Sequence, residues 1–79
     1  MRDYEFSISV RLPKGKVHDD YLKDFEEHTE ALVGIGNPDF LGLMFNKTTH
    51  TKIDALKQAI DEINQVMTEP DIWIIRFED

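Results

Sequence analysis

The stretch from Ala31 to Thr49, ALVGIGNPDFLGLMFNKTT, holds three of the four glycines of this 79-residue chain. Its two halves are apolar, and the Asn-Pro-Asp between them has strong turn chemistry. In the second half alternate residues belong to opposite faces of a strand: Leu41, Leu43 and Phe45 on one, Phe40, Gly42 and Met44 on the other. The stretch therefore predicts a β-hairpin with a three- or four-residue loop.

The glycines of this stretch do not form a phosphate-binding loop. Such a loop lies between a strand and the N-terminus of a helix, and a lysine follows at a fixed spacing. Gly34 and Gly36 instead lead into a second strand, and Gly42 lies within it. A glycine within a strand marks a bulge or the close approach of another backbone. We therefore expect Gly34 and Gly42 on the sheet face away from the helices, where they leave a shallow, smooth patch.

Two segments before the hairpin have clear periodicity. Residues 4–12, YEFSISVRL, alternate strictly and predict a half-buried strand with these residues inside: Tyr4, Phe6, Ile8, Val10 and Leu12. Residues 18–32, HDDYLKDFEEHTEAL, predict a short amphipathic helix in which Asp19 or Asp20 caps the first turn.

Two further segments follow the hairpin. Residues 49–67 predict the longer helix, which begins with a capping box between Thr51 and Asp54. Its apolar stripe recurs at helical spacing: Ile53, Leu56, Ile60, Ile63 and Met67. Residues 72–77, IWIIRF, predict the last strand.

The order of these elements, βαββαβ, predicts an α+β fold. Each helix has one apolar stripe, so both helices cover the same face of an antiparallel sheet. The right-handed crossover rule then gives a ferredoxin-like two-layer sandwich with strand order 4-1-3-2, a single domain over residues 1–79.

The charge balance limits the possible partners. Sixteen acidic residues oppose nine basic ones, for a net charge of −7. Binding to nucleic acid requires lysines and arginines against the phosphates, so we expect no direct nucleic-acid contact. The chain has no cysteine, no apolar run of membrane-spanning length and no signal-peptide pattern, so we expect a cytoplasmic protein without a membrane contact.

Candidates for chemistry are few. Asp24 and His28 lie four residues apart on the first helix, and His18 is the nearest further ligand, but we interpret them as solvated residues rather than a metal site. Ser7 and Ser9 lie on the polar side of the first strand without partners spaced for catalysis. We expect no enzymatic activity, no metal and no cofactor.

The open face of the sheet is the main candidate surface. Its predicted residues are Arg11, Phe40, Gly42, Met44 and Ile74. The last strand presents either Ile72 and Ile74 or Trp73 and Ile75 there, and both alternatives leave large apolar groups outside. An apolar patch with a polar rim marks an interaction surface, so we expect a protein partner, in the first place a homodimer.

The second candidate surface is acidic. Asp20, Asp24 and Glu27 lie on the first helix with further acidic neighbours: Asp19, Glu26 and Glu30. Such a strip imitates nucleic-acid phosphates, which makes an inhibitor of a basic nucleic-acid-binding protein, of the type encoded by phages and mobile elements, the first alternative. A small-ligand or metal sensor is the second alternative and rests on the fold alone.

The hairpin and the second helix also resemble a known family. The residues that match are Leu32, Gly34, Ile35, Gly36, Pro38, Leu43, Phe45, Ala59, Ile60 and Ile63. Over residues 30–66 they are similar to the N-terminal ancillary domain of small bacterial helix-turn-helix DNA-binding proteins. The chain departs from the family pattern at Asp39, at Met44 and at residues 47–49, and the helix-turn-helix part has no counterpart in these 79 residues. The resemblance therefore implies the ancillary domain alone, and the DNA binding of the helix-turn-helix part is not carried over to this chain.

Overall fold

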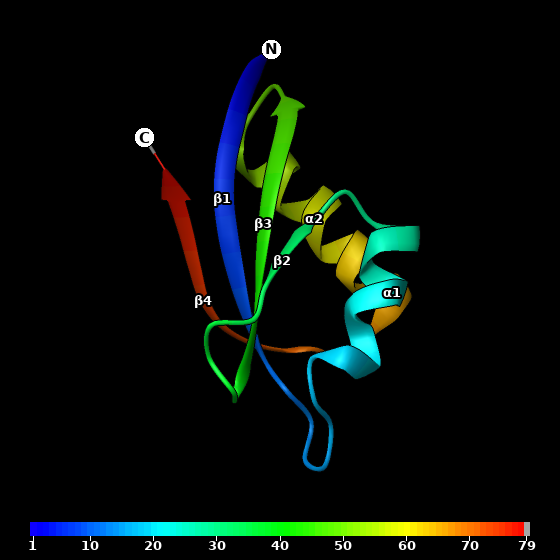
Figure 1. Cartoon of the computed structure of the whole chain (residues 1–79). Helices are drawn as coiled ribbons and strands as arrows, with labels where there is room; N and C mark the ends of the chain where they lie inside the picture. Colours follow the sequence, from blue (N-terminus) through cyan, green and yellow to red (C-terminus); the bar gives the residue numbers. More distant parts are fainter. Residues whose placement is uncertain (79) are drawn as a thin grey trace.

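Four strands and two helices alternate along the chain in the predicted order. The computed structural model describes residues 1–78, and its elements are β1 (Arg2–Arg11), α1 (Asp19–His28), β2 (Leu32–Gly34), β3 (Phe40–Thr49), α2 (Lys52–Val66) and β4 (Asp71–Glu78). The strands form one antiparallel sheet in the order β2-β3-β1-β4, which reads 4-1-3-2 from the β4 edge. Both helices lie on one side of this sheet (Figure 1), so the architecture is α+β with two layers.

The core lies between the sheet and the helices. The inward residues of the two central strands are buried: Phe6, Ile8 and Val10 of β1, and Leu41, Leu43 and Phe45 of β3. One row of aromatic rings crosses three strands at the same level, because Phe6 pairs in register with both Phe45 and Phe77. The ring centroids of Phe6 lie 5.6 Å from Phe45 and 4.7 Å from Phe77. The predicted inward face of the first strand is confirmed.

The hairpin is less symmetric than predicted. β2 has only three residues, and five residues, 35–39, connect it to β3. The Asn37 side chain accepts a hydrogen bond from the amide of Asp39 at 2.9 Å, a local turn that occupies residues predicted as strand or tight loop. β3 in contrast extends to Thr49, because β1 pairs with it over its whole length, from Arg11 opposite Phe40 to Arg2 opposite Thr49.

The ends of α1 differ from the prediction. His18 is the N-cap without a side-chain cap bond, and the carboxylate of Asp20 accepts instead from the amide of Val17 at 2.8 Å. The helix ends at His28 rather than near residue 32. Thr29 stops it, because its hydroxyl donates to the carbonyl of Phe25 at 2.6 Å and accepts from the amide of Ala31 at 3.1 Å.

The start of α2 is as predicted, but its buried face is rotated. Thr51 is the N-cap and accepts from the amide of Asp54 at 3.1 Å, which confirms the cap. The fully buried helix residues are Ala55, Ala59 and Ile63, whereas Ile53 is 66% exposed and does not belong to the core. A pattern built on large apolar residues does not include these alanines. Their small side chains let the helix lie close over β3.

The two helices are the only ones among residues 1–78, and neither combines the length and the apolar character that a membrane-spanning helix requires.

We expect the unfolding free energies of two variants to show which face of α2 is buried. Ile63→Ala removes a fully buried side chain and should lower the free energy of unfolding by about 2–5 kcal/mol. Ile53→Ala in the same helix should change it by less than about 0.5 kcal/mol, because Ile53 is exposed. Urea denaturation measures both. A cost for Ile53→Ala as large as that for Ile63→Ala would show that α2 buries the stripe read from the sequence.

Candidate interaction face of the sheet

The face of the sheet opposite the helices is the candidate site, and we call it the open face. In register, Ser7 lies beside Met44, Ser9 beside Gly42 and Arg11 beside Phe40, on the side away from the core. β4 adds Ile74 next to Ser9, and β2 adds Leu32 next to Met44. No helix of residues 1–78 covers this side (Figure 1).

A bulge in β4 brings an additional aromatic residue to the open face. Ser9 pairs with Ile74, but Val10 pairs with Ile72, so Trp73 is an extra residue in the ladder. A bulge of this kind breaks the strict alternation of faces. Trp73 and Ile74 therefore both lie on the open face, where they are 57% and 51% exposed. Neither of the two alternations considered for this strand is correct, because each assumed an unbroken period of two.

Arg11, Phe40 and Trp73 form a cluster at one end of the open face. The rings of Phe40 and Trp73 meet edge to face with their centroids 5.6 Å apart. The guanidinium carbon of Arg11 lies 5.8 Å from the centroid of Phe40 and 5.4 Å from that of Trp73. At these distances the cation is attracted to both rings, which restricts the side chain while its donors stay available.

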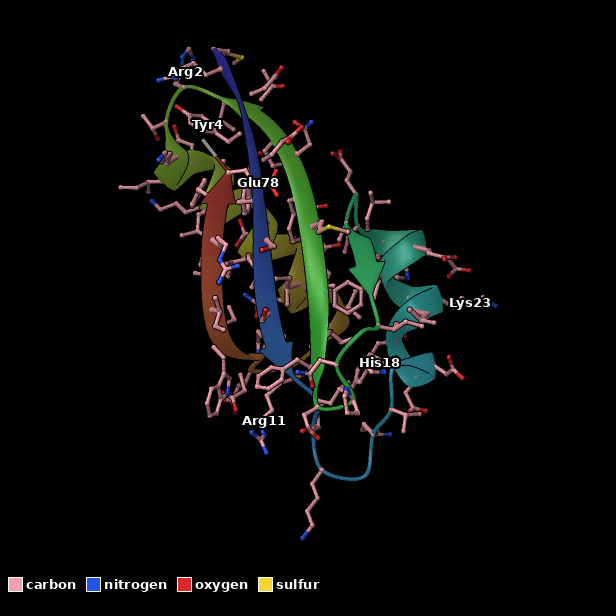
Figure 2. All side chains as sticks on the ribbon, turned by 60° about the vertical axis from the view of Figure 1, so that its left-hand side comes forward. Arg2, Tyr4, Arg11, His18, Lys23 and Glu78 are labelled. Atoms are coloured by element: carbon pink, nitrogen blue, oxygen red, sulfur yellow. The ribbon has the colours of Figure 1, made fainter. Side chains whose placement is uncertain are left out.

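The opposite end of the open face is acidic. Glu5 pairs in register with Glu78, and the side-chain amide of Asn46 lies 3.5 Å from Glu5. Asp3, one pleat further along β1, accepts a hydrogen bond from Thr48. Figure 2 shows Glu78 near one end of the sheet and Arg11 at the other. The open face thus carries Glu5 and Glu78 at one end and Arg11 at the other, where Asp71 pairs in register with Arg11.

Two glycines lie opposite each other in the middle. Gly34 pairs with Gly42, and a Cβ atom added to either would lie 3.6 Å from the carbonyl oxygen of the other, which is an ordinary contact. Neither residue has a positive φ. The predicted close backbone approach therefore does not require glycine here. What the glycines do is leave a hollow of about 280 Å³, lined by Ser9, Gly34, Gly36, Asn37, Phe40, Gly42 and Ile74.

Two large apolar side chains flank this hollow. Leu32 and Met44 pair in register on the open face and are 69% and 48% exposed. They also border a second hollow of about 510 Å³, which extends to Glu5 and Glu78 at the acidic end. Large and small side chains therefore alternate along β2 and β3 on this face.

The structure brings all five predicted open-face residues together. Arg11, Phe40, Gly42, Met44 and Ile74 lie on one side of three adjacent strands. Sequence reasoning missed Leu32, and it considered Trp73 only as an alternative to Ile74, not together with it. Trp73 is displaced by a bulge, which has no signature in a run of apolar residues. Leu32 lies two residues before Gly34 in β2, so the strand period that places Gly34 on this face places Leu32 there as well, and the register against β3 agrees.

The acidic side chains of α1 do not form a continuous strip of free carboxylates. Asp20, Asp24 and Glu27 are exposed on α1, as predicted. Asp20, however, accepts from the backbone at the start of the helix, and Glu27 lies 3.9 Å from Lys23. A surface that imitates phosphates needs its carboxylates free for a basic partner, so these contacts weaken that alternative.

The histidines do not converge on one place. Asp24, Glu27 and His28 have ligand atoms within 4.8 Å of one another, but all three are exposed. The Nε2 atom of His18 lies 2.8 Å from the carbonyl oxygen of Phe40, so this side chain links the start of α1 to β3. Exposed carboxylates beside a histidine are common on helices, and we assign no function to the group.

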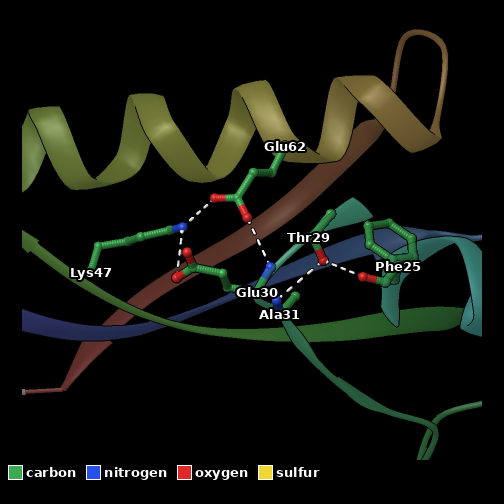
Figure 3. A network of polar contacts seen from close by, with 6 residues as sticks. All are labelled: Phe25, Thr29, Glu30, Ala31, Lys47 and Glu62. Carbon is green, nitrogen blue, oxygen red and sulfur yellow. Dashed lines mark hydrogen bonds and ion pairs between the residues drawn. The ribbon is translucent and has the colours of Figure 1, made fainter. Parts of the chain in front are cut away.

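A polar network under α2 is the one feature that sequence reasoning overlooked entirely. Lys47 belongs to the inward face of β3, and its side chain is 8% exposed. Its ammonium forms ion pairs with Glu62 of α2 and, at 3.4 Å, with Glu30 (Figure 3). Glu62 also accepts from the amide of Glu30 at 2.8 Å. The network ties β3, α2 and the segment after α1 together, which is a structural role.

No protein-family model matches the chain, and no curated protein and no solved structure matches it either.

We expect the Lys47 network to contribute more to the free energy of unfolding than a surface ion pair does. Lys47→Met should lower the free energy of unfolding by about 1–3 kcal/mol, because Glu62 is then a largely buried carboxylate without a cation. The double variant Lys47→Met with Glu62→Gln should recover part of this loss, since the glutamine oxygen still accepts from the amide of Glu30. Chemical denaturation provides both values.

Lys23→Met is the matched control, because Lys23 pairs with Glu27 in the open, with 83% and 53% of the two side chains exposed. Its cost should stay below about 0.5 kcal/mol. Equal losses of unfolding free energy for Lys47→Met and Lys23→Met would show that the buried ion pair stabilises the fold no more than an exposed one.

Proposed function

We propose that this ferredoxin-like domain is a non-enzymatic self-association module, in which a second copy of the chain covers the open face. The role is regulatory in kind, because a module of this type determines which chains are held together. The observation that carries the proposal is the group of exposed apolar side chains on a single uncovered sheet face: Leu32, Met44, Trp73 and Ile74.

The arrangement of this group is more typical of an interface than of apolar residues that are exposed singly. Single exposed apolar residues are normal on any protein, but a contiguous patch with a polar rim marks an interaction site. Here Leu32 and Met44 lie on one side of β1, and Trp73 and Ile74 lie on the other. The small side chains of Ser7 and Ser9 lie between the two pairs. Aromatic residues and arginine, which dominate binding energies, occur together in the cluster of Arg11, Phe40 and Trp73.

The charge distribution favours a second copy over an unrelated partner. A two-fold interface places the same surface on both sides, so that surface must be its own complement. The central strand β1 meets this condition on the open face, because it carries Arg11 at one end and Glu5 at the other. A partner with one sign of charge would match only half of it.

Dimerisation also fits the energetics of such a small domain. A chain of 79 residues buries a modest fraction of its surface, and small domains without disulfides or metals commonly gain stability through association. A standard interface takes about 800 Å² from each partner, roughly one seventh of the 5459 Å² that this chain exposes.

The glycines support the same proposal. Glycine within a strand costs about 0.5–1 kcal/mol relative to alanine, and the fold has room for a Cβ atom at both Gly34 and Gly42. We therefore infer that the two glycines serve the contact between copies, because they keep the middle of the open face free of side chains.

We expect sedimentation velocity between about 1 and 300 µM to show the mass rising from 9.2 kDa towards twice that value. Met44→Glu should raise the dissociation constant at least about 100-fold, because the two-fold interface would bury two unpaired carboxylates. The reason for choosing Met44 is its place at the middle of the open face.

Ile53→Glu is the matched control, since it makes the same kind of change at an exposed residue of α2 on the far side of the molecule. It should leave the mass distribution unchanged. A wild-type chain that remains monomeric over the whole range would contradict the proposal, and so would dissociation by Ile53→Glu to the same extent as by Met44→Glu.

A further inference from the structure

We infer that the two copies pack open face to open face with antiparallel strands, and that the two-fold axis crosses the strands at the level of Ile8. This inference rests on the proposed self-association and specifies its geometry. It follows from the order in which large, small and charged side chains succeed one another along the open face.

Two neighbouring rows on the open face have opposite character. The row at the level of Ser7 contains Leu32 and Met44, which are both large and exposed. The row at the level of Ser9 contains Gly34 and Gly42 on the same two strands. Ile8 lies between these rows and points to the opposite side, into the core. The midpoint between the large and the small row is therefore the level of Ile8.

A two-fold axis at this level, lying between the sheets and perpendicular to the strands, exchanges the two rows. Each strand then crosses over the same strand of the other copy in the opposite direction. Met44 faces the partner's Gly42, and Leu32 faces the partner's Gly34. The hollow of about 280 Å³ above the glycines receives the partner's Met44, and the symmetry fills both hollows at once. Interdigitation of this kind is how stacked sheets reach the packing density of a core.

The same axis pairs the charged ends. Arg11 and Glu5 lie three residues on either side of Ile8, which is about 10 Å along the strand. On β1 the rotation brings Arg11 over the partner's Glu5, and on β4 it brings Glu78 over the partner's Asp71, which pairs in register with Arg11. Aligned sheets cross at about 30°, and the long side chains of arginine and glutamate span the lateral offset that this angle produces. Two identical ion pairs result, one at each end.

The other simple two-fold arrangement lacks these matches. An axis parallel to the strands keeps every level opposite itself, so Arg11 would face the partner's Arg11 and Glu5 the partner's Glu5. It would also place β3 over the partner's β4, with Met44 against Arg76 rather than against a glycine. Like charges opposite each other oppose association. The antiparallel arrangement has such a pair on β4, Glu78 with Asp71, but only this arrangement forms the two ion pairs between Arg11 and Glu5 and matches large with small side chains.

A charge exchange first tests whether these two charged positions lie in the interface. In the antiparallel dimer, Arg11→Glu and Glu5→Arg each put like charges opposite each other when the variant pairs with itself. A mixed dimer of the two variants restores both ion pairs. Native mass spectrometry resolves the three dimers of an equimolar mixture, because the two exchanges shift the mass in opposite directions.

We expect the mixed dimer to make up at least about three-quarters of all dimers at low ionic strength, against about half for random pairing. The preference should decline as salt screens the pairs. Each exchange also moves the net charge of −7 by two units, so a control is needed. Lys57→Glu mixed with Glu26→Arg makes the same changes at exposed positions on the helices and should pair at random.

A mixture of Arg11→Glu with the wild type separates the two orientations. It should pair at random in the antiparallel dimer, because one restored and one repulsive contact balance. It should prefer the mixed dimer in the parallel one, where Arg11 would face the partner's Glu at the same position. A mixed-dimer preference in this experiment would overturn the inference.

A size exchange repeats the test without charge. Gly42→Met overfills the hollow and Met44→Ala leaves it empty, so each variant should self-associate at least about fivefold more weakly than the wild type. Their mixture should again favour the mixed dimer. Random pairing in both exchanges would overturn the antiparallel geometry while wild-type dimers still uphold the proposed function. A wild-type chain without dimers would instead overturn the proposed function itself.

Discussion

One-sided burial of the sheet is the constraint on which the rest of the structure depends. The inward residues of β1 and β3 are buried against α2 and α1, and the aromatic row of Phe77, Phe6 and Phe45 joins three strands at one level. Two short helices supply only enough apolar surface for this one side. Since strands alternate their faces, every residue that enters the core leaves a neighbour on the uncovered side.

The uncovered side departs from what the isolated fold would favour. Gly34 and Gly42 each have room for a Cβ atom and neither has a positive φ, yet they carry no side chain. The bulge at Trp73 turns a large aromatic side chain outward, next to Phe40 and Arg11. Departures from local preference tend to gather at functional sites. Here they gather on one face, which is why the interpretation centres on contact rather than on chemistry.

The covered side shows the opposite behaviour, because its polar residues all have partners that belong to the fold. Lys47 enters the inward face of β3 and reaches Glu62 and Glu30, and Thr29 closes α1 by bonding to Phe25 and Ala31. Among the described residues no buried side-chain nitrogen or oxygen lacks a hydrogen-bond partner. Satisfied groups of this kind hold the elements of the fold together.

Periodicity in the sequence was sufficient for the element order and for the faces of the long strands. Alternation from Tyr4 to Leu12 and from Phe40 to Phe45 specifies the inward side without further information, and Thr51 specifies the start of α2. Three features could not be predicted from periodicity, each for a physical reason. The buried face of α2 uses alanines, which carry little hydropathy signal. The bulge of β4 depends on its pairing with β1, and Lys47 is buried only because carboxylates from two distant segments meet it.

We propose above all that a second copy of the chain lies on the open face. An isotope-filtered NOE experiment on an equal mixture of ¹³C-labelled and unlabelled chains tests it directly, at a concentration where dimers dominate. We expect contacts between the methyl group of Met44 in one copy and the α-protons of Gly42 in the other. Intermolecular contacts confined to residues of α1 and α2, or none at all, would contradict the account.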